Sequence, residues 1–340
     1  MTPRPPVRAS APAFLQRLTS KILSGSGSFV QRLSKGKMES AVGVTVGAVW
    51  VLSAPVFVFC AAVDFLDRGP DCIPLLVSGL IVGLLGLLVV RLSSFPSSLP
   101  VSRLFASVVS GAVAALIAVT VAHLATDTSI ALDVALVEAA ATVTGTNAST
   151  LNADSMSLGV TLLRALGQWL SAGAIIVVLV RVMPHLGVGG LDADGGVATR
   201  SARRLAPRSG STMARLVSLY IGLTVLCAFA YLVAGMPWMD SWIHSLTTLS
   251  SGGFSTRPGS IGAFDSPAVE WVAIVGMVVA GTSLPLMFRA LRRGDLHRFV
   301  RSVEFRTYIG LILISVVACI AWSDTWPTVS DLRHSLFAVV

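Results

Sequence analysis

The chain has 340 residues, of which 54% are hydrophobic and 12% charged, and its mean hydropathy is +0.80. Soluble domains carry charge on about a quarter of their residues, so this composition excludes a soluble globular protein and indicates a membrane protein. A net charge of +8 at pH 7 would suit nucleic acid, but the placement of the basic residues assigns it to membrane orientation instead, and we expect no nucleic-acid partner.

The first 38 residues are polar and basic, and the first apolar run begins only at Ala41. This pattern predicts a basic cytosolic tail with one loosely apolar helical face, and no cleavable signal peptide. The cysteines are scattered, without a Cys-x-x-Cys pair, so neither a disulfide framework nor a metal site is expected; they are Cys60, Cys72, Cys227 and Cys319.

Seven segments are apolar over about 20 residues, the length that crosses about 30 Å of hydrocarbon. These predicted spans are residues 41–63, 72–90, 104–122, 158–180, 216–234, 268–288 and 305–322. With the tail in the cytosol, all but four of the 25 Lys and Arg residues fall on the inner side; the exceptions are Arg68, Arg164, Arg257 and Arg333. Because positive residues collect on the cytosolic side, the N-terminus is expected inside.

Two of the outer connections share one plan. Residues 130–143 form an apolar run too short to cross a bilayer, and a Thr- and Gly-containing stretch follows it. Residues 238–249 form a second such run before a Ser- and Gly-rich stretch, and residues 332–340 begin a third. The sequence therefore predicts an all-α polytopic membrane protein, with two preceding helices and then repeated units of helix, re-entrant pore loop and helix.

The chemistry of the second loop suits a cation. A short helix that ends at Leu249 points its carbonyl end into the membrane, where that end attracts positive charge. Carbonyls beyond it can replace the hydration shell of an ion if the backbone takes conformations that Gly252 and Gly253 allow. The hydroxyls of the loop are expected to tie it to its neighbours, whereas a phosphate-binding loop is excluded because the required Lys and following helix are missing.

The run Ser251-Gly-Gly-Phe-Ser-Thr-Arg-Pro-Gly-Ser-Ile261, with Glu270, Met277 and the 302–306 segment, resembles the second filter unit of the Trk/Ktr/HKT potassium transporter superfamily. Upstream, Glu138, Arg164, Gln168-Trp169 and the segment 184–190 follow in the order of that family, most like the bacterial Trk membrane subunit. The resemblance implies a pseudo-fourfold pore for K⁺ in the plasma membrane, without enzymatic activity or a cofactor. It also implies a homodimer and a cytosolic nucleotide-binding regulatory subunit.

On this resemblance the chain divides into a tail (1–38), a two-helix hairpin (39–95), a first unit (96–186), a cytosolic loop (187–212), a second unit (213–294) and the start of a third (295–340). The implied filter residues are Thr144, Gly145, Thr146 and Asn147 in the first unit and Ser250, Ser251, Gly252 and Gly253 in the second, with Gly252 as the expected axial glycine. The family register puts Asn147 where a filter glycine is usual, and a two-residue slip would put Gly145 there. With Asn147 at a filter position, the conducted cation is expected to be either K⁺ or Na⁺.

By the family register a third filter glycine would lie beyond Val340, and a fourth unit would be missing, so the sequence predicts a truncated product. The alternatives are a non-conducting remnant of such a transporter, a Na⁺-permeable protein, or a cation-coupled carrier of an organic solute.

Several polar residues leave two interpretations open. Arg164 either extends to the outer membrane surface or pairs with an acid such as Glu138, which itself is expected to be a capped acid rather than an ion ligand. His244 is expected to be a packing residue, and Arg257 is either an interface anchor or an electrostatic gate.

Overall fold

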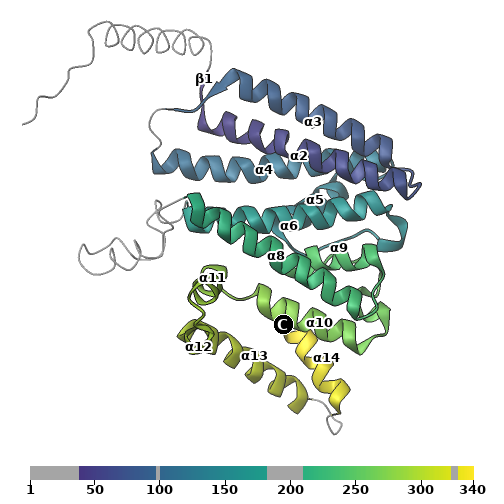
Figure 1. Cartoon of the computed structure of the whole chain (residues 1–340). Coiled ribbons are helices and arrows are strands. Elements are labelled where there is room, and N and C mark those ends of the chain that lie inside the picture. Colours follow the sequence, from purple (N-terminus) through teal and green to yellow (C-terminus); the bar gives the residue numbers. More distant parts are fainter. Residues whose placement is uncertain (1–37, 97–99, 182–209, 323–327) are drawn as a thin grey trace, which may run out of the picture.

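The computed structural model describes residues 38–96, 100–181, 210–322 and 328–340, and it is almost entirely helical (Figure 1). Residues 1–37 of the expected tail (1–38) and residues 187–209 of the expected cytosolic loop (187–212) lie outside these ranges. Within them, six helices are long and apolar enough to cross a bilayer, or seven if one bent pair is counted as a span. Large apolar side chains point outward from these helices, as lipid-facing side chains do; they include Leu52, Phe59, Leu84 and Val225. The chain is a multi-pass α-helical membrane protein.

Helices α2 (Ala41–Leu66) and α3 (Cys72–Leu92) form an antiparallel hairpin that precedes the repeated units. Small residues let their backbones approach closely: a Cβ on Gly86 would lie 2.9 Å from the carbonyl oxygen of Gly47. At the open end of the hairpin, the two-residue strands β1 (Met38–Glu39) and β2 (Ser93–Ser94) pair in parallel.

A buried carboxylate joins this hairpin to the first unit. Asp64, at the end of α2, is fully buried, and its oxygens accept hydrogen bonds from the backbone N–H groups of Asp71 (2.8 Å) and Gly159 (2.9 Å). Gly159 lies in the first turn of α6 (Leu158–Arg181), where helix N–H groups have no partner within the helix. Asp64 therefore fixes the start of the helix that carries Arg164 and Gln168.

The two repeated units have matching elements. The first consists of α4 (Val101–Thr126), the half-helix α5 (Leu132–Thr144), a loop containing the short helix η1 (Ala153–Ser155), and α6. The second consists of α8 (Gly210–Val233), the half-helix α9 (Trp238–Leu249), a loop with η3 (Ser260–Phe264), and α10 (Pro267–Ala280). Helix α9 has the bounds that the sequence predicts, whereas α5 is displaced from the predicted 130–143. Figure 1 shows α5, α6, α8 and α9 between the α2–α4 layer and the C-terminal helices.

The expectation of one continuous span at 268–288 is wrong. Helix α10 stops at Ala280, and α11 (Leu284–Arg293) continues at an angle of 91° to it. Pro285 lies in the first turn of α11, and its ring cannot be accommodated by a preceding helical turn. The break therefore coincides with a residue that starts helices but does not extend them.

The remaining helices are α12 (Leu296–Val300), α13 (Val303–Ala321) and α14 (Val329–Val339). Helix α14 begins before the predicted residue 332 because Thr328 and Asp331 form a capping box at its N-terminus. Figure 1 shows α14 beside α10, and an ion pair of 2.5 Å between Arg333 and Glu270 joins the two helices.

Candidate cation pathway

Both half-helices end in the same turn. Helix α5 is capped by Gly145, with φ of 69°, and the next residue, Thr146, donates its N–H to the carbonyl of Ala141 at 3.0 Å. In the second unit, Ser251 has φ of 56°, and Gly252 donates to Thr247 at 2.9 Å. From the half-helix through the start of the loop, each second-unit residue carries the number of its first-unit counterpart plus 106, as for Thr146 and Gly252. The two loops therefore leave their helices along equivalent paths.

The same offset relates a second pair of contacts. Glu138 on α5 accepts a hydrogen bond from Ser149, eleven residues later, at 2.8 Å. His244 on α9 bonds to Ser255, also eleven residues later, at 3.0 Å. In each unit a buried polar residue of the half-helix thus holds the returning loop, which shows that the repeat extends to side-chain contacts.

This equivalence pairs Asn147 with Gly253, and Gly145 with Ser251. This pairing differs from the sequence expectation, in which Asn147 takes the filter position that Gly252 takes in the second unit. A Cβ on Gly253 would lie 3.1 Å from the Cβ of Asn147, so these two residues also lie side by side in space. Their backbones differ, because Gly253 has φ of 82° whereas Asn147 does not adopt positive φ.

In the second loop, buried and exposed residues alternate. Gly252 and Phe254 are buried, whereas Ser251 and Gly253 are exposed. In the first unit the exposed loop positions include Thr144, Thr146 and Asn147. The exposed positions of the two loops therefore carry hydroxyl, amide and backbone groups.

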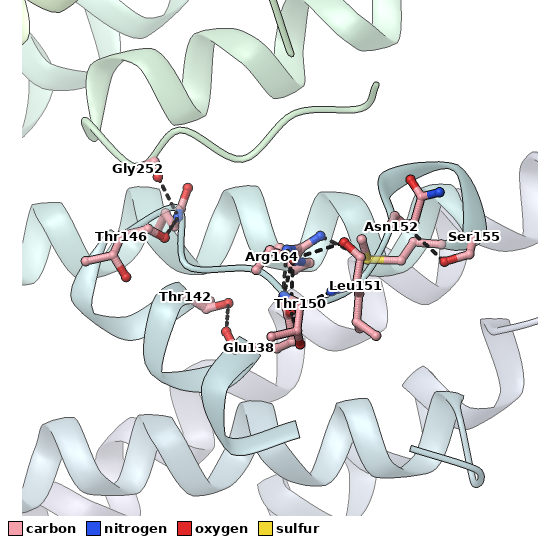
Figure 2. A network of polar contacts seen from close by, with 12 residues as sticks. Glu138, Thr142, Thr146, Thr150, Leu151, Asn152, Ser155, Arg164 and Gly252 are labelled. Atoms are coloured by element: carbon pink, nitrogen blue, oxygen red, sulfur yellow. Dashed lines mark hydrogen bonds and ion pairs between the residues drawn. The ribbon is translucent and has the colours of Figure 1, made fainter. Parts of the chain in front are cut away.

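Glu138 is the best-connected acid of the site. Its side chain is 0% exposed, and its Oε1 accepts from the N–H groups of Thr150 (2.7 Å) and Leu151 (3.2 Å). Its Oε2 lies 2.7 Å from the Nη2 of Arg164 on α6 (Figure 2). Loop N–H groups, the Ser149 hydroxyl and Arg164 together occupy both carboxylate oxygens, as expected of a capped acid.

Arg164 forms the pair that the sequence left open. Its residue exposure is 2%, so the interpretation that it extends to the membrane surface is wrong. Its Nη2 also donates to the Ser149 hydroxyl at 2.6 Å, and its guanidinium carbon lies 3.8 Å from the ring centre of Phe254 in the second loop. The Arg164 side chain thus contacts both loops, and its guanidinium group stacks on the aromatic face of Phe254.

In the second unit the polar residues are less connected. His244 is buried, with its Nδ1 2.8 Å from the carbonyl of Asp240, consistent with a packing role. Arg257 pairs with Asp240 at 3.3 Å and lies over the ring of Phe264, but 41% of its side chain is exposed. Of the two interpretations of Arg257, these contacts support an anchor at the outer edge of the site.

Two expected hydroxyl contacts between the second loop and its surroundings are present. Thr248 bonds to the Tyr231 hydroxyl of α8 at 2.8 Å, and Ser255 bonds to His244. In the part of the chain that the structure describes, the Ser250 hydroxyl bonds only within its own helix turn, to the carbonyl of Thr247 at 3.3 Å. In the first loop, Thr144 and Thr146 lie within hydrogen-bonding distance of each other, at 3.2 Å.

Gln168 is the site residue that sequence reasoning did not assign to the filter. Its amide nitrogen donates to the carbonyl oxygens of Thr146 and Gly252, each at 3.0 Å, so one side chain joins the two loops. Figure 2 shows the Gly252 segment facing Thr146. The sequence does carry a signal for the register between the two units, since the eleven-residue spacing from Glu138 to Ser149 recurs from His244 to Ser255. It carries none for the Gln168 bridge, which depends on how α6 is placed.

Comparison with known proteins agrees with this architecture. The profile of the TrkH family, described as a cation transport protein, matches residues 101–332. The Trk system potassium uptake protein TrkH of Halomonas elongata is 38% identical over 182 residues, which cover 51% of this chain and 37% of that protein. The Escherichia coli K12 protein of the same name is 36% identical over 180 residues, covering 52% and 37%.

A solved structure gives the same result for the fold. The crystal structure of the potassium transporter TrkH from Vibrio parahaemolyticus matches with a TM-score of 0.76 at 24% identity, covering 88% of this chain and 63% of that one. The chain aligns with only 37% of the length of each of the two relatives compared above. Since the family profile matches more than half of the chain, this protein belongs to the TrkH family of cation transport proteins.

Proposed function

We propose that this chain forms part of a potassium uptake pathway in the bacterial plasma membrane, with its N-terminus in the cytosol. The observation that carries the proposal is the convergence of two half-helix C-termini, α5 and α9, on two equivalent loops joined by Gln168. Carbonyl ends of helices favour a cation, and exposed loop backbone at membrane depth is tolerated where it lines an aqueous path. The potassium uptake function named for the relatives supports K⁺ as the ion.

In this proposal the exposed groups of Thr144, Thr146, Asn147, Ser251 and Gly253 line the ion path, and the ion is bound by oxygen atoms without covalent chemistry. A homodimer and a cytosolic nucleotide-binding regulatory subunit complete the proposed assembly, on the strength of the family resemblance. The division of the chain into a hairpin and repeated units is supported by the matching contacts of α5 and α9.

The test is potassium uptake in a strain that lacks its own potassium transporters. The chain is expressed as it stands, and also as a chimera in which residues 101–332 replace the matching part of Escherichia coli TrkH. The chimera is expected to restore growth at low potassium and uptake of Rb⁺. A chimera that reaches the membrane in normal amounts but takes up no Rb⁺, while the parental TrkH does, would overturn the proposal.

Asn147 makes a specific prediction about selectivity. Its side chain adds an amide at a position where the second unit has Gly253, and its carbonyl accepts from the Ser149 N–H at 2.9 Å. Asn147→Gly removes the side chain, and we expect the K⁺/Na⁺ uptake ratio of the chimera to rise by about threefold to tenfold, the range of a 1 kcal/mol effect. The measurement is competition of Na⁺ with Rb⁺ uptake, with Asn152→Gly as a control at a loop position near η1. An unchanged ratio would remove Asn147 from the ion path.

A further inference from the structure

Gln168 lies between the two loops of the proposed ion path, and its role in that path rests on the proposed function. Gln168 is 0% exposed. Its amide nitrogen donates to two carbonyl oxygens, that of Thr146 in the first loop and that of Gly252 in the second. These two carbonyls occupy equivalent positions in the repeat. A single amide therefore holds the same point of two neighbouring loops at one fixed separation.

The space for this amide depends on Gly252. A Cβ at residue 252 would overlap the Oε1 of Gln168. Among the residues that the structure describes, that Oε1 has no hydrogen-bond partner, although it is buried. Because an unpaired buried acceptor costs free energy, the position of this side chain is maintained by its two donor contacts rather than by its oxygen.

The bridge lies next to the residues that line the path. Asn147 and Gly253 directly follow Thr146 and Gly252, and a Cβ on Gly253 would lie 3.1 Å from Asn147. A displacement of either bridged carbonyl therefore changes the distance between the two exposed residues. Since the spacing of oxygen ligands and the rigidity with which they are held both influence cation preference, the bridge acts on selectivity.

In the described part of the second unit, no amide side chain takes the place of Gln168. Thr142 contacts Gly167 on α6, and its counterpart Thr248 contacts Gly276 on α10, where a Cβ would lie 2.7 Å from the threonine methyl. The residues that follow these glycines are Gln168 and Met277. A methionine side chain has no N–H to donate, so the amide bridge belongs to the contact between the first and second units.

We propose that Gln168 is a positioning residue that sets the separation of the first two filter loops and thereby the discrimination between K⁺ and Na⁺. Gln168→Leu keeps most of the side-chain volume but removes both donors. Gln168→Glu keeps the shape but turns an oxygen toward the two carbonyls. Both variants lose the two hydrogen bonds that hold the loops together, so we expect the K⁺/Na⁺ uptake ratio to fall by about tenfold or more.

The matched control is Thr224→Val. Thr224 is buried on α8 and accepts a hydrogen bond of 3.0 Å from Trp169, the residue after Gln168 on α6. This variant also removes a buried hydrogen bond of α6, but one directed away from the loops. We expect its uptake ratio to match that of the unmodified chimera, and an equal fall in the control would assign the effect to general loosening and overturn the proposal.

A second measurement does not depend on transport. In the purified chain, hydrogen exchange of the Thr146 and Gly252 amides reports the turns that precede the bridged carbonyls. Gln168→Leu is expected to speed exchange in 142–151 and 247–256 together, whereas Thr224→Val leaves both unchanged. Unchanged exchange in Gln168→Leu, or a normal K⁺/Na⁺ ratio at a normal membrane level, overturns the positioning role. Absence of uptake by the unmodified chimera overturns the proposed function itself, and with it the role in selectivity.

Discussion

Replacing Arg164 with methionine is expected to destabilise the protein by about 3–5 kcal/mol, the range found when one partner of a buried ion pair is removed. The side chains of Arg164 and Glu138 are 3% and 0% exposed, so the carboxylate left behind in Arg164→Met has no access to water. Glu138 also holds the loop through the N–H groups of Thr150 and Leu151. Loss of the pair should therefore disturb the loop as well as the fold.

The control for this prediction is Arg257→Met. Arg257, like Arg164, pairs with a carboxylate and lies over a phenylalanine ring, but 41% of its side chain is exposed. Exposed ion pairs are worth about 0–1 kcal/mol, so this variant should be close to the unmodified protein. Thermal unfolding of the purified chain in detergent measures both. Equal, small losses in the two variants would contradict the role assigned to Arg164.

A double substitution sharpens the test. In Glu138→Gln with Arg164→Met, the amide oxygen can still accept from Thr150 and Leu151, and no buried charge remains without a partner. Replacing both members of a buried pair is often nearly neutral, so the double variant should be more stable than Arg164→Met alone. A double variant that is less stable would mean that the arginine acts mainly through its other contacts, with Ser149 and Phe254.

The second large effect is expected for Gly252→Asp, which should reduce Rb⁺ uptake by the chimera to background. Gly252 is buried against Gln168, and any side chain at this position overlaps the Gln168 amide. Overpacking alone costs about 1–3 kcal/mol, and here it acts on the residue that joins the two loops. An aspartate also places a carboxylate next to the carbonyls of Thr146 and Gly252, both of which accept from Gln168.

Gly262→Asp is the matched control, because a Cβ at Gly262 would meet no atom within 4 Å although it lies in η3 of the same connection. Uptake by this variant should stay within about twofold of the unmodified chimera, as expected for a surface substitution of about 0.5 kcal/mol. Western blotting of membranes separates loss of uptake from loss of protein. Normal uptake in Gly252→Asp would remove this loop from the proposed pathway.

Much of the fold could be predicted from the sequence because it depends on local patterns. Apolar length fixes the membrane-crossing helices, and the short apolar run with polar flanks gave α9 its observed bounds, 238–249. The placement of α14 and the break after Ala280 were predicted less well, because a capping box at Thr328 and the proline at residue 285 act on single turns within an otherwise apolar pattern.

What the sequence by itself determined is the membrane class, the paired half-helices and the resemblance of the Gly252–Gly253 loop to a cation filter, all of which follow from composition and local order. The tertiary structure alone decided that Arg164 pairs with Glu138 and that Gln168 joins the two loops. These contacts link residues 22 to 84 positions apart for Gln168 and 26 apart for the ion pair. Side chains so distant in sequence meet only because α6 packs behind both loops, and no local pattern encodes that placement.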